Sequence, residues 1–507
     1  MIQVDGLCLR YDETLFDDVC FSLQPKERCA LVGLNGTGKS SLFRLLTGKE
    51  TPDKGTIAKR KNYTIGILDQ HIVFTRDTLI EEAALGLRPE ESDCIYKAET
   101  ILFGLGFKEE DLDRSPQEFS GGYQLRLHLA KVLVGEPDCL LLDEPTNYLD
   151  IISIRWFTTF LQEWQGEFIL ISHDREFLDS ISTHTMGIHR KKVTKVKGSS
   201  IDFFEQLMQS EEMHEKTRQN MEKKRDHLQG FIDRFGAKAS KAVQAKSKQK
   251  ALGRIPVLEN LKNLCNLDFQ FNEAFFPGKK MLEVNNLCFS YHENAEVPLI
   301  EDFSLSVEKG ERIAIIGKNG RGKSTILRLL AGELTPQSGN SKVSENLSIG
   351  YFGQTNIDRL HPKNSIEAEI SAANPKLNLT QVKGICGLMM FGGDKSKKVN
   401  GVLSGGEKSR VLLGKIIAAP CNLLLLDEPT HHLDMESIEA LIDAIEDFDG
   451  AVIMVTHSEL ILKRMGLDKI VLCHEGQQEL YLGTYEEFLE EQGWDESGAL
   501  KSKNAKK

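Results

Sequence analysis

The feature that most constrains the fold of this chain is a glycine-rich loop that occurs twice. Residues 33–41 read GLNGTGKSS and residues 317–325 read GKNGRGKST. An apolar run precedes each loop, and both loops match the spacing GxxxxGK[ST], in which backbone N–H groups surround phosphate oxygens where a helix begins. Both copies therefore predict a buried strand, a phosphate-binding loop and a helix, in that order.

Other motifs recur at the same separation. Six residues of the first half each have an identical residue 284 positions later. The pairs are Lys39 and Lys323, Gln70 and Gln354, Ser120 and Ser404, Asp143 and Asp427, Asp150 and Asp434, and His173 and His457. One offset shared by six features indicates an internal duplication. The chain is therefore predicted to have an α/β fold with two P-loop NTPase domains in tandem.

The duplication divides the chain into four predicted segments. The first copy spans residues 1–205, the second spans residues 279–494, and a polar, basic linker occupies residues 206–278. Residues 495–507 form a basic tail that we expect to be disordered. The length of the chain agrees with this division, because 507 residues exceed what one hydrophobic core usually supports.

The linker concentrates positive charge in a chain whose net charge is −12. Residues 216–254 contain twelve Lys or Arg and three Asp or Glu. Residues 203–235 and 237–252 are both rich in helix-forming types and are separated by one glycine. The pattern predicts an α-helical hairpin with a strongly basic tip near residues 234–248, which indicates a partner-binding element.

Composition disfavours a secreted or membrane-spanning protein. The longest apolar runs, such as residues 423–426, are far too short to cross a bilayer, and the N-terminus shows no secretion signal. The ten cysteines include no CxxC pair, which fits reduced thiols rather than a zinc site or disulfides. We therefore expect a soluble, cytoplasmic protein with no membrane partner.

Each copy also contains an apolar run that ends in two acids, CLLLDEP and LLLLDEP. Such runs are typical of buried parallel strands. At the carboxyl end of the strand the aspartate can support Mg²⁺, and the glutamate can polarise the attacking water as a general base. In the loops, the lysine reaches the β- and γ-phosphates and the serine binds Mg²⁺. Hydrolysis of a nucleoside triphosphate with Mg²⁺ is thus the predicted chemistry, and these motifs alone fit many NTPases.

A Ser-Gly-Gly motif precedes each acid pair, in FSGGYQLR and LSGGEKSR. With these motifs in this order, the chain resembles the ATP-binding cassette superfamily. The resemblance implies that the Ser-Gly-Gly loop of one cassette contacts the γ-phosphate held by the other, since a helix N-terminus offers N–H groups to an anion. Lys39 would then share ATP with Ser404, and Lys323 with Ser120, within a monomer.

The resemblance also assigns roles to individual residues. The catalytic residues would be Glu144, His173, Glu428 and His457. The Mg²⁺ ligands would be Ser40, Gln70, Asp143, Ser324, Gln354 and Asp427. ATP would be bound by Tyr11, Gly33, Asn35, Gly36, Gly38, Lys39, Ser40, Ser41, Ser120, Gly121 and Gly122, and by Tyr291, Gly317, Asn319, Gly320, Gly322, Lys323, Ser324, Thr325, Ser404, Gly405 and Gly406. The two tyrosines would stack on adenine, and Asp150 and Asp434 would couple one site to the other.

Over nearly its whole length the chain resembles the ABC-F family, which combines tandem cassettes with a charged helical hairpin between them. The resemblance implies a translation factor that binds the ribosomal exit-tRNA site, with the hairpin tip near the P-site tRNA and 23S rRNA. ATP would join the cassettes and hydrolysis would release the protein, so that it modulates translation or relieves stalls. The expected RNA contacts are Arg234, Lys238, Lys241, Lys246, Lys248 and Lys250, because cations that neutralise phosphates release counterions.

Three other functions remain open at this stage. The chain could be the ATPase component of an ABC transporter, a DNA-repair or chromosome ATPase, or an antibiotic-resistance ABC-F protein that protects the ribosome. A basic linker has no use in a transporter ATPase, and neither long coiled coils nor zinc modules interrupt a cassette. The short hairpin turn favours a housekeeping role over ribosome protection.

The two copies also differ near their sites. THSE at residues 456–459 replaces the SHDR of residues 172–175, and Tyr123 stands where the second copy has Glu407. Both sites keep their Lys, Asp, Glu and His residues, so we expect both to be competent. We hypothesise that they hydrolyse ATP at different rates.

Overall fold

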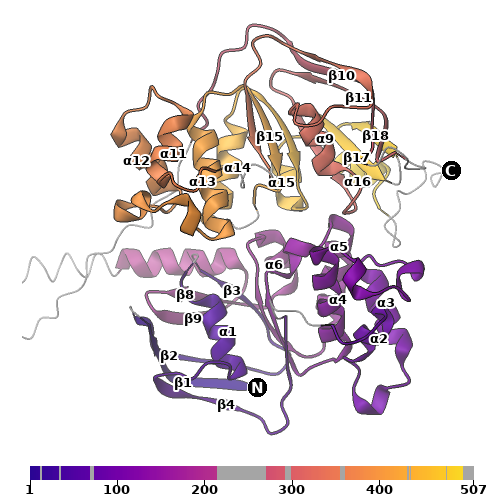
Figure 1. Ribbon diagram of the computed structural model, residues 1–507. Helices are drawn as coiled ribbons and strands as arrows, with labels where there is room; N and C mark the ends of the chain where they lie inside the picture. The colour runs from indigo at the N-terminus through magenta and orange to yellow at the C-terminus, as the bar shows by residue number, and fades with distance from the viewer. Residues whose placement is uncertain are drawn as a thin grey trace, which may run out of the picture. The chain divides into compact units, whose positions relative to one another are not determined.

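A computed structural model of the chain describes residues 1–11, 14–33, 36–68, 74–213, 270–291, 298–353, 360–430, 433, 435–474 and 477–494 (Figure 1). The chain divides into two compact units, which are residues 1–195 with 267–507 and residues 196–266. Both phosphate-binding loops lie in the first of these units. The predicted α/β fold with two tandem domains is confirmed.

The first copy is built on two sheets. Its strands are β1 (Ile2–Arg10), β2 (Thr14–Leu23), β3 (Arg28–Val32), β4 (Lys54–Lys59), β5 (Ile65–Ile67), β6 (Cys139–Asp143), β7 (Glu167–Ile171), β8 (His184–His189) and β9 (Lys192–Lys197). The order β2-β1-β4 makes a three-stranded antiparallel sheet, and β5-β6-β7-β3-β8-β9 makes a six-stranded sheet. The strands from β5 to β8 pair in parallel, so their carboxyl ends share one edge, where ligands bind in such sheets.

The second copy repeats this topology. Its strands are β10 (Lys280–Phe289), β11 (Ile300–Glu308), β12 (Arg312–Gly317), β13 (Ser338–Val343), β14 (Ile349–Phe352), β15 (Leu423–Asp427), β16 (Ala451–Val455), β17 (Lys469–His474) and β18 (Gln477–Leu482). They form the sheets β11-β10-β13 and β14-β15-β16-β12-β17-β18, and only the edge pair β17–β18 of the larger sheet is antiparallel. The duplication read from the sequence is therefore a duplication of structure.

The helices fall into matching groups. In the first copy they are α1 (Lys39–Thr47), α2 (Leu79–Ala84), α3 (Ile95–Gly104), α4 (Gly121–Val134), α5 (Ile151–Glu163) and α6 (Arg175–Ile181). In the second they are α9 (Lys323–Leu330), α11 (Ile366–Ala373), α12 (Leu379–Leu388), α13 (Gly405–Ala418), α14 (Met435–Glu446), α15 (Glu459–Arg464) and α16 (Tyr485–Glu491). Within each copy, α2, α3 and α4, or α11, α12 and α13, pack together as a helical lobe (Figure 1).

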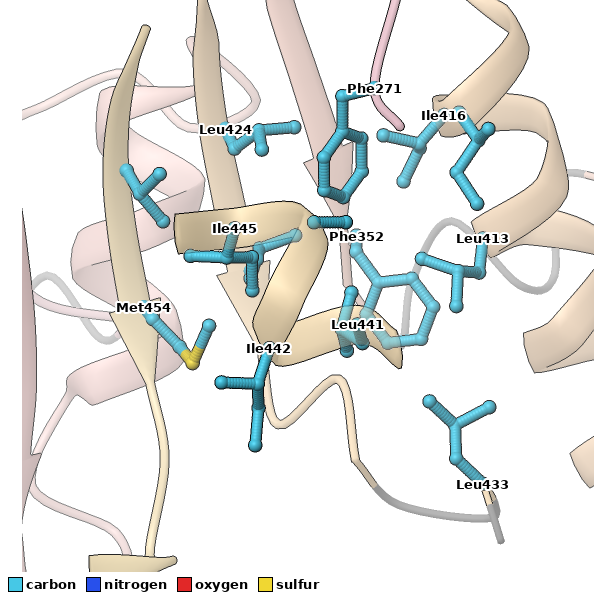
Figure 2. Packing of buried hydrophobic residues seen from close by; sticks show 14 of the residues in the cluster. Phe271, Phe352, Leu413, Ile416, Leu424, Leu433, Leu441, Ile442, Ile445 and Met454 are labelled. Atoms are coloured by element: carbon cyan, nitrogen blue, oxygen red, sulfur yellow. The ribbon is translucent and has the colours of Figure 1, made fainter. Parts of the chain in front are cut away.

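A large apolar core lies in the second copy. Figure 2 shows α14 residues Leu441, Ile442 and Ile445 close to side chains of the sheet and of α13. Strands β6 and β15 are buried over their apolar residues, as the runs CLLLD and LLLLD predict for strands covered on both faces. These two strands carry the acid pairs to the edge of each sheet.

The end of the predicted linker is part of the second copy's packing. Phe271 and Phe276 are buried, and the Ala274 N–H donates to the Cys421 carbonyl at 2.8 Å. Residues 270–276 thus pack on the second copy ahead of the predicted boundary at residue 279, because two aromatic side chains bury there. At the other end, residues 200–213 are helical, which includes the first part of the helix predicted for residues 203–235. The rest of the predicted hairpin lies outside the described residues.

Candidate functional site: two cavities between the copies

Each phosphate-binding loop connects a buried strand to a helix. In the first copy β3 ends at Val32 and α1 begins at Lys39, and in the second β12 ends at Gly317 and α9 begins at Lys323. Gly38 has φ 102°, and a Cβ there would lie 2.8 Å from a Leu15 methyl carbon, so this turn requires glycine. The predicted strand, loop and helix are therefore present in both copies.

The first cavity, about 540 Å³ in volume, lies against the loop of Lys39. It is lined by predicted residues of the first copy, namely Tyr11, Gly36, Gly38, Lys39, Ser40, Ser41, Asp143, Glu144 and His173. Ser404 and Gly406 of the second copy line the same cavity. The loop of one copy thus faces the Ser-Gly-Gly helix of the other.

The second cavity, about 640 Å³ in volume, has the reciprocal arrangement. Its lining from the second copy includes Tyr291, Asn319, Gly320, Gly322, Lys323, Ser324, Thr325, Asp427, Glu428 and His457. Ser120 and Gly122 of the first copy complete it. Gly33, Gly121, Gly317 and Gly405 belong to the same loops and helix ends but are not among the residues that line these two cavities. Asn35, Gln70, Gln354, Asp434 and the six basic linker residues lie outside the described residues.

In the first cavity the polar side chains form short contacts around the phosphate-binding loop. The Lys39 ammonium donates to the Gly33 carbonyl at 2.6 Å, and the Ser40 hydroxyl donates to Asp143 Oδ2 at 2.8 Å. Glu144 Oε1 lies 3.4 Å from His173 Nε2. Burial raises the pKa of Glu144 to about 8, and the adjacent Asp143 carboxylate adds to the shift. A carboxylate with a raised pKa is a stronger base toward water.

The second cavity repeats these contacts. The Lys323 ammonium donates to the Gly317 carbonyl at 2.9 Å and to Asn319 Oδ1 at 3.2 Å. Glu428 Oε1 lies 3.4 Å from His457 Nε2, and burial raises the pKa of Glu428 to about 8. The same pairing of a glutamate and a histidine therefore occurs in both cavities.

Both glutamates have backbone conformations that are rare for residues with a side chain. Glu144 has φ 49° and Glu428 has φ 48°. A left-handed conformation costs about 1–3 kcal/mol in a residue other than glycine, and it persists only where the surrounding structure enforces it. Each glutamate lies directly after its buried strand, so the turn aims the carboxylate into the cavity. Nothing in the residue pattern indicates this strain.

Two residues link the copies: Asp150, to which the resemblance assigns coupling of the two sites, and Asn147, which no motif indicates. Asp150 Oδ2 accepts the Asn319 N–H of the opposite loop at 3.3 Å, and it lies 3.3 Å from Arg126 Nη2. Burial alone would raise the pKa of Asp150, but Arg126 and the N–H donors of Ser153 and Asn319 outweigh it and lower the pKa. Asn147 lines both cavities. The arginine that follows Ser-Gly-Gly in both copies is the one signal that could have revealed Arg126.

The oxygen donors fit Mg²⁺ that arrives with a nucleotide. Each cavity has one serine and one aspartate in contact, Ser40 with Asp143 and Ser324 with Asp427. Among the described residues, no cluster of three or more His, Cys, Asp or Glu could hold a metal ion by itself. Mg²⁺ usually takes one or two protein oxygens and completes its shell with phosphate and water, which matches this donor set.

Two phosphate-binding loops, each facing the Ser-Gly-Gly helix of the other copy, define a P-loop ATPase with tandem ATP-binding cassettes. Comparison with known families agrees. A family model described as ABC transporter matches residues 16–147 and 300–431, and an extension model with the same description matches residues 186–270.

Two sequence relatives identify the family within this class of ATPases. The chain is 34% identical to the probable ATP-binding protein YheS of Haemophilus influenzae, over 96% of this chain and 81% of that protein. It is 31% identical to ABC transporter F family member 5 of Arabidopsis thaliana, over 94% of this chain and 75% of that protein. The chain belongs to the ABC-F family, binds ATP and is an ATPase.

Solved structures share the fold. The RNase-L Inhibitor superposes with a TM-score of 0.65 at 19% identity, over 99% of this chain and 96% of that one. An archaeal ribosome recycling factor, aABCE1, solved with the ribosomal stalk protein aP1, gives the same values. In the described part of the chain, no helix has both the length and the apolar character that a membrane crossing requires.

Proposed function

We propose that this ATPase is a cytoplasmic monomer that binds the ribosome at its exit-tRNA site. ATP joins the two cassettes, and hydrolysis releases the protein, so that it modulates translation or relieves stalls. The observation that carries the proposal is the composite lining of both cavities. Because each cavity needs residues from both cassettes, nucleotide stabilises the paired form of the cassettes.

The chemistry of each site follows from its side chains. Lys39 and Lys323 bind phosphate oxygens, and the N–H groups that begin α4 and α13 meet the γ-phosphate from the other side. Glu144 and Glu428 accept the proton of the attacking water, and the paired histidines hold these carboxylates in place. Mg²⁺ held by the serine and aspartate oxygens supplies neutralisation of the phosphate charge. Tyr11 and Tyr291, about half exposed in the cavities, offer rings to adenine.

The positive charge of the linker is the reason to propose the ribosome as the partner. The linker sequence carries twelve basic residues between positions 216 and 254, and RNA is a dense polyanion whose phosphates such residues can neutralise. The structurally similar aABCE1 is a ribosome recycling factor, which supports the proposal through fold similarity. The proposed contacts on 23S rRNA and P-site tRNA are Arg234, Lys238, Lys241, Lys246, Lys248 and Lys250.

The test uses a variant that binds ATP but cannot hydrolyse it. The double change Glu144→Gln with Glu428→Gln should hold the cassettes together and keep the protein on ribosomes in the presence of ATP. Sedimentation through a sucrose gradient measures the bound fraction. The matched control changes Lys39→Ala and Lys323→Ala, removes ATP binding and should leave the protein unbound. A Gln variant that stays at the top of the gradient contradicts the proposal.

A second experiment tests the linker. Changing the six proposed RNA contacts to Gln should weaken ribosome binding and reduce the slope of log K against log salt by about 4. The control removes the same charge from six exposed lysines of the cassettes, namely Lys59, Lys61, Lys309, Lys342, Lys376 and Lys383. Equal salt slopes in the two variants would exclude the linker as the RNA contact.

A further inference from the structure

The two cassettes are joined by ion pairs outside the nucleotide cavities. Arg155 Nε on α5 lies 2.6 Å from Glu459 Oε1 on α15, and Arg175 Nη1 on α6 lies 3.2 Å from Glu439 Oε1 on α14. All four side chains are between 26% and 34% exposed, so the pairs are partly shielded from solvent. We name these four residues the seam clamp.

A buried tyrosine supports one of the pairs. The Arg155 guanidinium donates to the Tyr485 hydroxyl at 3.2 Å, and that hydroxyl donates to Glu459 at 3.4 Å. Tyr485 is fully buried in the core of the second cassette. The position of the Arg155–Glu459 pair is therefore set by a rigid side chain rather than by two mobile ones.

The internal duplication shows how the two ion pairs of the seam clamp are related. The counterpart of Arg155 at the 284-residue offset is Glu439, and the counterpart of Arg175 is Glu459. Thus α5 pairs with α15 and α6 pairs with α14, and these two contacts are equivalent under the duplication. The contacts are equivalent in place, but the first cassette supplies both arginines and the second supplies both glutamates.

A pairing between identical cassettes would reverse this match. Two first cassettes would bring Arg155 opposite Arg175, and two second cassettes would bring Glu439 opposite Glu459. Two arginines opposite one another at a partly shielded contact repel strongly. The two glutamates repel less, because Arg464 and Lys463 of the same cassette lie 2.7 Å from Glu439 and 3.6 Å from Glu459. Opposite charges instead fix the register of an interface. A symmetric pairing requires a self-complementary surface, and neither cassette has one at the seam clamp.

A third pair follows the same rule. Lys463 on α15 contacts Glu176 on α6. Its counterparts are Asp179 for Lys463 and Leu460 for Glu176. Two first cassettes would therefore place Asp179 opposite Glu176. None of the three ion pairs would therefore form between two identical cassettes.

We propose that the seam clamp is a recognition code, by which the first cassette accepts the second cassette and rejects another copy of itself. The partner that this surface fits is a cassette with glutamates at the positions of 439 and 459. The code acts in addition to the covalent linker, which favours pairing within the chain through effective concentration. It is independent of whether the partner of the linker is the ribosome.

The first test asks whether the charges act as pairs. Arg155→Glu with Arg175→Glu makes all four residues of the seam clamp acidic, and Glu439→Arg with Glu459→Arg makes all four basic. Each variant should lose at least about tenfold in ATP hydrolysis, because both cavities need the cassettes paired. The fourfold exchange that combines them should recover the rate to within about twofold. No recovery in the fourfold variant, or no loss in either double variant, overturns the proposal.

The second test separates pairing from selection. Exchanging one pair alone, Arg175→Glu with Glu439→Arg, keeps both ion pairs within the chain but makes each cassette self-complementary. The fourfold exchange keeps the same ion pairs and restores the rejection of like cassettes. Sedimentation velocity over rising protein concentration, with a non-hydrolysable ATP analogue, should show the one-pair variant dimerising at a concentration about tenfold lower. Equal association of the two variants overturns the proposal that the seam clamp prevents identical cassettes from pairing.

A matched control accounts for charge alone. Lys395→Glu with Lys397→Glu changes the net charge as much as the all-acidic variant does, at exposed positions of the second helical lobe. It should leave the hydrolysis rate and the association state unchanged. A loss as large as that of the all-acidic variant overturns the seam clamp as the cause. Thermal unfolding of each variant separates a pairing defect from a folding defect, since the fourfold variant carries every substitution and should regain both stability and rate.

Discussion

The cavities at Lys39 and Lys323 contain matching proposed catalytic residues and differ in the helix that reaches each from the opposite cassette. Over the Lys39 cavity, Ser404 is held by Glu407 in a capping box, with the hydroxyl donating to the carboxylate at 3.2 Å. Over the Lys323 cavity, Ser120 makes no side-chain capping bond, and Tyr123 takes the place of Glu407. The first cavity therefore faces an extra carboxylate, and the second faces an aromatic ring.

The arginine one turn further along differs as well. Arg126 is 1% exposed, donates to the Leu105 carbonyl at 2.9 Å and pairs with the buried Asp150. Arg410, its counterpart, is only half-buried and lies 5.4 Å from the Phe391 ring centre. The comparison teaches that the duplicated cassettes kept the residues around the phosphates and diverged one turn behind them, where charge and rigidity are set.

The largest expected effect comes from removing one proposed general base at a time. Glu144→Gln or Glu428→Gln should each lower hydrolysis at its own site by about 10²–10⁴-fold, because a positioned base contributes that much. Single-turnover assays on each variant then report the rate of the intact site. We expect unequal residual rates, while Glu301→Gln on the surface should leave the rate unchanged. Equal residual rates would contradict the hypothesis that the two sites hydrolyse ATP at different rates.

The difference in the arginines predicts a difference in stability. Arg126→Leu leaves Asp150 buried without its cation and should cost about 3–5 kcal/mol in the free energy of unfolding. Arg410→Leu removes a half-buried side chain and should cost about 1 kcal/mol. Urea unfolding followed by tryptophan fluorescence can assign the loss, because Trp156 and Trp164 belong to the first cassette and Trp494 lies at the end of the second. Similar losses of unfolding free energy in the two variants would contradict the predicted difference between Arg126 and Arg410.

The smallest expected effect concerns the extra carboxylate. Burial alone would raise the pKa of Glu407, but hydrogen bonds from the Ser404 N–H and hydroxyl outweigh it and lower the pKa, so this side chain is ionised. Glu407→Gln keeps a side chain that can complete the capping box and removes the charge. ATP should bind the Lys39 site about fivefold more tightly, since a nearby like charge in water costs about 1 kcal/mol. Titration with a fluorescent ATP analogue measures this change.

The reciprocal variant tests the effect of the same charge on ATP affinity at the other site. Tyr123→Glu brings a carboxylate to the Lys323 cavity and should weaken ATP there by a similar factor. An unchanged affinity in both variants would show that the charge at this position does not reach the phosphates.

The sequence was sufficient for the features that depend on short segments. The phosphate-binding loops, the strands before them and the helices at Lys39 and Lys323 follow from glycine spacing and apolar runs, because φ > 0 turns and buried strands restrict nearby residues strongly. The constant 284-residue offset identified the duplication and hence the repeated sheets. The residues assigned to each ATP site follow from those motifs, and their roles remain predictions that the variants above test.

What the sequence could not supply are features that depend on how distant surfaces meet. The strain at Glu144 and Glu428, the burial of Arg126 against Asp150 and the packing of Phe271 on the second cassette have no local pattern.

By itself, the sequence determined that this chain has two phosphate-binding cassettes with a strongly basic linker between them, because glycine spacing, strand patterning and charge are properties of neighbouring residues. Only the tertiary structure decided that Arg155 meets Glu459 and that Arg175 meets Glu439. Residues 304 and 264 positions apart are brought together by the packing of whole cassettes, and no periodicity along the chain encodes which charged surface a cassette will face.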